Sequence, residues 1–140
     1  MEIKQAKEKS EFLKCWDVVR ELRPHLDREE YLTLMLYMLD EGYKLVYVEE
    51  DNVAVAFCGY RIMSLLFSGR GIYIDDLCTL ESHRGKGCAK ALLDQVCQEA
   101  KRQEMKTIQL DSGHHRFGAH RLYLNYGFRI IAHHFILDVK

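Results

Sequence analysis

A short basic turn, Arg-Gly-Lys-Gly at residues 84–87, separates a β-rich run from an amphipathic helix and strongly restricts the possible folds. The run before it, residues 71–80, is rich in residues typical of strands. The segment after it, residues 87–104, places its apolar side chains on one helical face, and a further apolar run follows at residues 106–111. Strand, turn, helix and strand in this order predict a β-α-β unit.

The turn has the chemistry of an anion-binding site. Gly85 and Gly87 can adopt positive φ and expose consecutive N–H groups, and the following helix adds its unpaired N-terminal donors. Arg84 and Lys86 add positive charge, so a pyrophosphate fits this turn. The alternative is a basic turn that only links two elements. A Walker A loop fits worse, because no glycine here precedes a Lys-Ser or Lys-Thr pair. A G-x-G-x-x-G dinucleotide fingerprint also fits worse, because the position of its third glycine is Lys90.

Local signals predict the elements outside this unit. Asp27, followed three residues later by Glu30, has the form of a capping box, and Asp51-Asn52 is a hairpin turn with a bulge expected near Gly59. The expected elements are a strand at residues 2–6, a helix from about Ser10 to Pro24, a helix from Asp27 to Gly42, strands at residues 43–49 and 53–62, a helix at residues 118–125 and a last strand at residues 128–139.

Length and composition indicate one globular domain over residues 1–140. The chain is 48% hydrophobic and 29% charged, as in an ordinary globular protein. Its formal net charge is -1 and its basic residues are interspersed with acidic ones, so no basic stripe for nucleic acid is expected. The polar N-terminus and the lack of an apolar run of roughly 18 residues predict no membrane partner and a cytoplasmic location. Five cysteines without a CxxC pair predict reduced, mostly core-filling thiols.

Three segments together resemble the GCN5-related N-acetyltransferase superfamily, GNAT. Arg84, Gly87 and Ala89 match the family's coenzyme A signature [R/Q]-x-x-G-x-[G/A], in a strand-turn-helix context. Residues 72–79 are similar to the family's fourth strand, and residues 119–128 are similar to its A-x-x-x-Y-x-x-x-G-F motif. The resemblance covers the chain from about residue 71 to its end.

The resemblance implies an α/β fold with acetyl-CoA as co-substrate. No metal is expected, because no residue spacing in the chain is that of a zinc site. The expected sheet is mixed, mostly antiparallel and six- to seven-stranded, flanked by about four helices, with a central β-α-β coenzyme-binding unit. The fourth and fifth strands would splay apart to admit the pantetheine arm. Its amides would pair with the backbone of Leu77, Cys78 and Thr79. The pyrophosphate would be held by Arg84, Gly85, Lys86, Gly87, Cys88, Ala89 and Lys90.

By the same resemblance, Tyr123 is the general acid beside the coenzyme sulfur. A phenol with a pKa of about 10 can protonate a departing thiolate whose conjugate acid has a pKa of about 8.5. Without the motif, Tyr123 would be interpreted as a core residue on the apolar stripe of its helix. Tyr126, one turn onward, is interpreted as packing.

Asp75 and Asp76 are the candidates for handling the amine. Side chains of strand neighbours point to opposite faces, so at most one of the two is expected to face a given site. The resemblance to polyamine-type members implies that Asp75 or Asp76 binds or deprotonates the amine, directly or through water. The other interpretation is a carboxylate that pairs with a surface base. The acceptor pocket is expected from the first two helices and the connection at residues 63–69.

Other polar residues give weaker signals. The pairs His114-His115 and His133-His134 lack the spacing of a zinc site, although His115 or His120 could line an acceptor pocket. Arg116 stands where the family often has asparagine, so pantetheine contacts could differ. Cys78 and Cys88 lie near the proposed coenzyme site but are interpreted as packing, with a covalent route left open.

The expected function is an N-acetyltransferase acting on a primary amine of a small molecule, such as a polyamine or an amino compound, by direct attack in a ternary complex. The alternatives are a protein N-terminal or lysine acetyltransferase and a non-catalytic acetyl-CoA-binding sensor. The retained Tyr123 argues against the sensor. Dimers are common among members of the family, so a homodimer is a further possibility.

Overall fold

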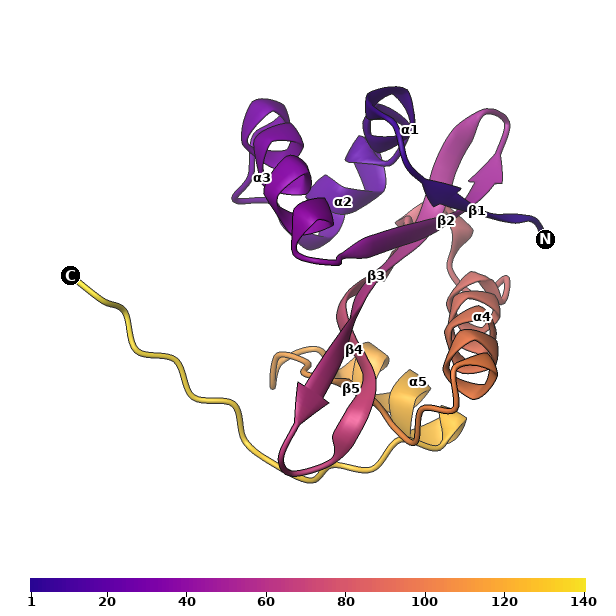
Figure 1. The fold of residues 1–140 in the computed structure, drawn as a ribbon. Coiled ribbons are helices and arrows are strands. Elements are labelled where there is room, and N and C mark those ends of the chain that lie inside the picture. The colour runs from indigo at the N-terminus through magenta and orange to yellow at the C-terminus, as the bar shows by residue number, and fades with distance from the viewer. The chain divides into compact units, whose positions relative to one another are not determined.

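A long antiparallel hairpin, β3 (Val53–Leu65) with β4 (Gly69–Thr79), is the central feature of the sheet (Figure 1). β2 (Lys44–Glu50) pairs antiparallel with β3, and β1 (Ile3–Ala6) pairs antiparallel with β2. β5 (Ile108–Leu110) is the neighbour of β4 and completes a five-stranded sheet in the order β1-β2-β3-β4-β5. The α/β class and the predominantly antiparallel pairing are as predicted.

The computed structural model describes residues 1–140 as two compact units, residues 1–109 and residues 110–140. The first carries the hairpin and four helices, and the second carries one helix and the C-terminal segment. None of the helices combines the length and the apolar character needed to cross a bilayer.

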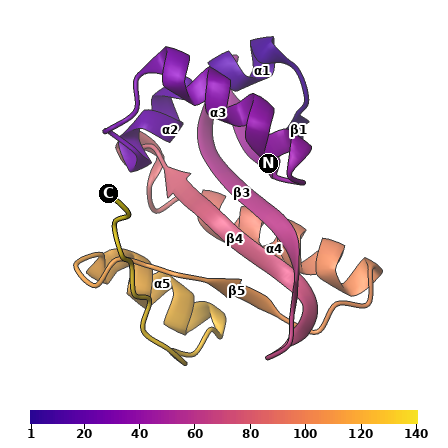
Figure 2. The same cartoon turned by 60° about the vertical axis from the view of Figure 1, so that its left-hand side comes forward.

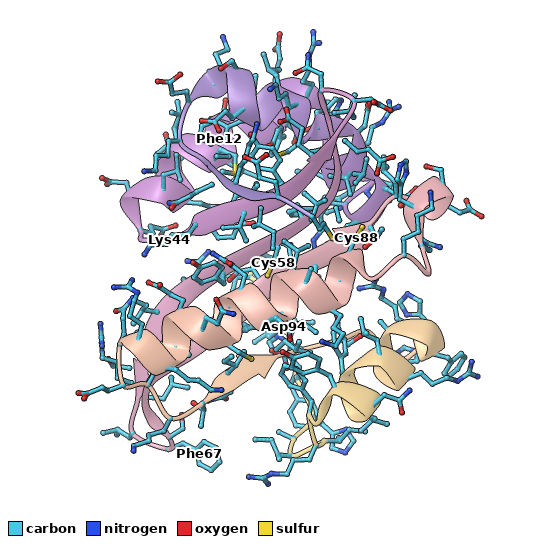
Figure 3. All side chains as sticks on the ribbon, turned by 90° about the vertical axis from the view of Figure 1, so that its right-hand side faces the viewer. Phe12, Lys44, Cys58, Phe67, Cys88 and Asp94 are labelled. Atoms are coloured by element: carbon cyan, nitrogen blue, oxygen red, sulfur yellow. The ribbon has the colours of Figure 1, made fainter.

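Helices cover both faces of the sheet in the first unit (Figures 1 and 2). One face packs on α1 (Lys9–Lys14), α2 (Trp16–Leu22) and α3 (Arg28–Asp40), and Leu45 and Phe57 are buried in that core. The other face packs on α4 (Cys88–Arg102), whose buried side chains are Cys88, Leu92, Leu93, Val96 and Ala100. Because side chains alternate along a strand, the Phe57 neighbour Cys58 faces α4 (Figure 3).

The strongest local predictions are confirmed. Glu30 N–H donates to Asp27 Oδ1 at 2.8 Å, and Asp27 N–H donates to Glu30 Oε1 at 3.3 Å, which completes the capping box of α3. Asp51 and Asn52 have φ values of 52° and 65°, the left-handed conformation that a two-residue hairpin turn requires. Each of these features depends on residues at most three positions apart, so a short stretch of sequence is enough to predict it.

The single helix expected between Ser10 and Pro24 is instead two short helices. Cys15 separates α1 from α2 with a ψ of -8°, far from the helical value, and its N–H reaches the carbonyls of Glu11 and Phe12. A three-residue 3-10 helix, Glu81–His83, also follows β4. The chain therefore has five α-helices, α1 to α5, rather than about four; α5 spans Phe117–Tyr126 in the second unit.

The prediction of a last strand at residues 128–139 is wrong. Residues 128–140 contain no helix or strand, and Phe135, Leu137 and Val139 are at least 86% exposed. The backbone N–H and C=O groups of a strand need hydrogen-bond partners on a neighbouring strand. A segment rich in β-branched residues does not by itself provide that neighbour. The sheet accordingly has five strands rather than six or seven.

We expect Asp27→Ala to lower the free energy of unfolding near neutral pH, because the Glu30 N–H loses its acceptor. That hydrogen bond lowers the pKa of Asp27 below its ordinary value of 3.8. A lowered folded-state pKa means that the stabilisation is complete above the unfolded-state pKa and is lost as the pH falls through the folded-state pKa. Urea denaturation at a series of pH values should show the difference from wild type shrinking below pH 3.8.

Thr33→Ala, at an exposed position in the middle of α3, is the matched control and should have little effect at any pH. A difference between wild type and Asp27→Ala that does not change with pH would contradict this assignment of the cap.

Candidate functional site

The turn before α4 has the conformation expected of an anion cradle. Gly85 and Gly87 have φ values of +77° and +86°, and a Cβ at either position would have no atom within 4 Å. No side chain caps the N-terminus of α4, and no acidic residue lies in its first turn. The turn therefore leaves open space, backbone donors and a positive helix end, which fit the pyrophosphate of a coenzyme.

Arg84 in the turn and Lys90 in the first turn of α4 each have a carboxylate partner. Arg84 Nη2 lies 3.4 Å from Glu21 Oε2, and Arg84 Nε lies 3.4 Å from the carbonyl oxygen of Thr79. Glu21, on α2, also accepts from the Glu81 N–H at 3.4 Å, and Lys90 pairs with Asp94 at 2.9 Å. Sequence reasoning missed Glu21, because a partner 63 residues from Arg84 has no local signal.

The backbone predicted to contact pantetheine lies at the end of β4. Leu77 and Thr79 pair with Cys58 and Ala56 of β3, which occupies one edge of this segment. On the other side β5 has three residues against eleven in β4, so it can pair with only part of that edge. This difference in length leaves backbone groups of β4 without a strand neighbour, as insertion of an extended pantetheine arm requires.

A bulge in β4 overturns the expectation that Asp75 and Asp76 face opposite sides. Gly59 pairs with Asp76 and Tyr60 pairs with Ile74, so Asp75 is an extra residue in the register. The carbonyl of Asp75 accepts from Arg23 Nη2 at 3.0 Å. Because an extra residue shifts the alternation of the strand, both carboxylates border the same cavity.

Each carboxylate of the pair is bound by its own arginine. Arg61 donates from Nε and Nη2 to Asp75 at 3.1 and 2.7 Å. Arg23 donates from Nε and Nη2 to Asp76 Oδ1 at 3.0 and 2.8 Å, and the Tyr43 hydroxyl donates to Asp76 Oδ2 at 2.7 Å. We call these five residues the acid–arginine cluster. With two aspartates and two arginines, it has no net formal charge.

The cluster is partly shielded from water, and this perturbs its protonation. Burial raises the pKa of Asp75 above its ordinary value of 3.8, although the Arg61 guanidinium opposes the shift. Burial also raises the pKa of Tyr43, and the Asp76 carboxylate adds to that effect. Tyr43 therefore stays a neutral donor at neutral pH.

Gly59 allows Tyr43 to reach Asp76. A Cβ at Gly59 would lie 1.6 Å from the Tyr43 hydroxyl oxygen and 2.2 Å from its ring carbon Cζ. The Arg61 guanidinium also packs over this ring, with its carbon 5.6 Å from the ring centroid. The sequence indicated a bulge near Gly59, and the register shift is there, but the contact with Tyr43 was not predicted.

A cavity of about 410 Å³ lies beside the acid–arginine cluster. The helices α2 and α3 contribute apolar side chains to its wall, as expected for an acceptor pocket. Residues 63–69, also expected to border it, do not. They are the end of β3, the hairpin turn and the first residue of β4, and Phe67 in the turn is 80% exposed (Figure 3).

Tyr123 lies in the second unit, on the buried face of α5. Its ring makes an edge contact with Phe128 at a centroid distance of 5.7 Å. Its carbonyl accepts from the N–H groups of Gly127 and Phe128 at 3.1 and 2.9 Å, and Gly127 has a φ of 123°. These contacts end the helix and explain the spacing of Tyr, Gly and Phe in the motif. Tyr126 also lies beside Phe128, at 6.0 Å.

The histidines and cysteines do not come together in a metal site. His120 Nε2 is 2.8 Å from the carbonyl oxygen of Gly113, and no group of three or more His, Cys, Asp or Glu side chains is arranged to hold a metal. Arg116 is half-buried and precedes α5. None of the five cysteines forms a disulfide, and burial raises the pKa of Cys88 even though this residue begins α4.

Comparison with known proteins agrees with this geometry. A family model described as the acetyltransferase (GNAT) family matches residues 9–128. A Bacillus subtilis (strain 168) protein named uncharacterized N-acetyltransferase YhdJ is 33% identical over 135 residues, which are 95% of each chain.

Solved structures of low sequence identity share the fold. Ribosomal-protein-alanine N-acetyltransferase from Brucella melitensis biovar Abortus 2308 has a TM-score of 0.83 and 16% identity, over 99% of this chain and 100% of that one. Aminoglycoside N-acetyltransferase AAC(6')-Iy in complex with CoA has a TM-score of 0.86 and 17% identity, over 99% of this chain and 94% of that one.

We expect Gly59→Ala to destabilise the protein by about 1–3 kcal/mol, because the new methyl group overlaps the Tyr43 phenol and displaces it from Asp76. Urea denaturation measures this change. Gly118→Ala is the matched control: a Cβ at this helical position meets nothing within 4 Å, so the change should be neutral or stabilising by up to about 1 kcal/mol. Equal losses from the two substitutions would contradict the close approach at Gly59.

Proposed function

The chain belongs to the acetyltransferase (GNAT) family and is an acetyl-CoA-dependent N-acetyltransferase. We propose that its acceptor is a primary amine of a small molecule, a polyamine or another amino compound. The amine attacks the thioester directly in a ternary complex. The observation that carries the proposal is the cavity beside Asp75 and Asp76, on the same strand as the expected coenzyme contacts. Because the family match spans residues 9–128, we treat residues 1–140 as one catalytic domain.

The coenzyme would bind along β4 and the turn that follows it. Backbone groups of Leu77, Cys78 and Thr79 would pair with the amides of pantetheine. The segment Arg84–Lys90 would hold the pyrophosphate through its backbone N–H groups and basic side chains. The positive φ of Gly85 and Gly87 and the uncapped N-terminus of α4 support this assignment.

The acceptor would occupy the cavity. Its volume of about 410 Å³ is in the range of pockets for small molecules. Asp76 directly precedes Leu77, so an amine at the carboxylates would lie near a thioester carried along the next residues of the strand. This adjacency supplies the proximity that a two-substrate reaction needs.

The residues divide two proton transfers between them. As the uncharged amine attacks the thioester carbonyl, Asp75 or Asp76 would take a proton from its nitrogen, directly or through water. The carbon–sulfur bond then breaks, and Tyr123 would donate its hydroxyl proton to the departing thiolate. A neutral acid–arginine cluster favours the uncharged amine, because it offers no net negative charge to hold an ammonium.

We expect Tyr123→Phe to lower kcat about 100-fold on the best small amine, because the substitution removes a general acid while keeping the ring. The assay measures thiol release from acetyl-CoA, and affinity for acetyl-CoA should be unchanged. Tyr126→Phe, the neighbouring tyrosine on α5, is the control and should retain activity. Equal turnover of wild type and Tyr123→Phe would remove Tyr123 from this role.

We expect Gly87→Glu to reduce acetyl-CoA affinity below the limit of titration calorimetry, because a side chain and a negative charge enter the cradle at a residue with positive φ. Gln98→Glu adds the same charge on the exposed side of α4 and should leave affinity unchanged. Undiminished binding by Gly87→Glu would show that the pyrophosphate binds elsewhere.

A further inference from the structure

The charge balance of the cavity bears on which amines it accepts. Asp75 and Asp76 would attract a polyamine if they were free, but each makes two hydrogen bonds to an arginine. The Asp75 and Asp76 side chains are 23% and 13% exposed, so both carboxylates are largely shielded from solvent. The two charges of the pair are therefore cancelled inside the protein, before any substrate enters.

The rest of the cavity wall is mostly apolar. Val19 and Leu26 come from α2 and the loop after it, and Leu34, Met35 and Met38 come from α3. The wall has no carboxylate other than Asp75 and Asp76. A second ammonium placed against leucine and methionine would lose hydration without gaining an ion pair, and this is costly.

We propose that the acceptor is a monoamine with an apolar body, and that polyamines are poor substrates. This inference rests on the proposed function and narrows it. The amine end meets the lone pairs that the two aspartates keep beside their arginine bonds. The apolar body lies against α2 and α3, where its burial supplies the binding free energy. Selection comes from apolar contact and from the absence of a second negative site.

Hexylamine and 1,6-diaminohexane test this inference, because the two amines share a six-carbon chain and differ in the second amino group. We expect kcat/KM for thiol release to be at least about tenfold higher for hexylamine, after a twofold correction for the two equivalent amines, because the second ammonium must lose hydration. Equal or better use of 1,6-diaminohexane would overturn the inference.

A pair of α3 variants shows whether this cavity makes the selection. Leu34 borders the cavity and is 43% exposed, so Leu34→Glu can place a carboxylate at the wall without burying it fully. Leu36 is 69% exposed and does not border the cavity, so Leu36→Glu is the matched control. We expect Leu34→Glu to reduce the preference for hexylamine about tenfold, through a new ion pair with the second ammonium, and Leu36→Glu to leave it unchanged. Equal effects of both variants would overturn the assignment to this cavity.

The same assays separate this inference from the function on which it rests. Turnover of a peptide or an aminoglycoside, with neither six-carbon amine used, would overturn the inference while acetyl transfer stands. Binding of acetyl-CoA with no thiol release for any amine would contradict the proposed function, and the inference with it.

Discussion

The one-residue bulge in β4 at Asp75 determines the chemistry of the cavity. In a regular strand, Asp75 and Asp76 would lie on opposite faces of the sheet. The extra residue instead turns both carboxylates to the cavity, and Arg23 binds the free carbonyl of Asp75 as well as the Asp76 carboxylate. Gly59 and Tyr43 complete the arrangement, because the absence of a Cβ at Gly59 lets the phenol reach Asp76.

The arginines change the net charge that the two aspartates bring to the cavity. Two adjacent aspartates in a sequence indicate negative charge, but Arg23 and Arg61 cancel that charge within hydrogen-bond distance. Partly buried carboxylates need such partners, since an unpaired buried charge is costly. The cavity that results combines a neutral, strongly dipolar end with apolar walls. Such a site positions a polar group and lets apolar contact provide affinity.

β4 is the element that joins the parts of the proposed mechanism. Its side chains Tyr73, Asp75 and Asp76 border the cavity. Its eleven residues exceed the three of β5, and the turn after it carries Gly85 and Gly87. Glu21 links α2 to the start of this turn through Arg84 and the Glu81 N–H. Direct contacts within residues 1–109 therefore connect α2, which borders the cavity, with the turn before α4.

The sequence by itself determined the features whose partners are close along the chain. The capping box of α3, the left-handed Asp51-Asn52 turn, the positive φ of Gly85 and Gly87, and the motif around Tyr123 were all predictable, because each depends on a few neighbouring residues. Only the tertiary structure decided the break at Cys15, the missing strand at residues 128–139 and the partners of the aspartates. Arg23 lies 53 residues from Asp76, and a strand's register and partners are set by contacts between distant segments, which local patterns do not contain.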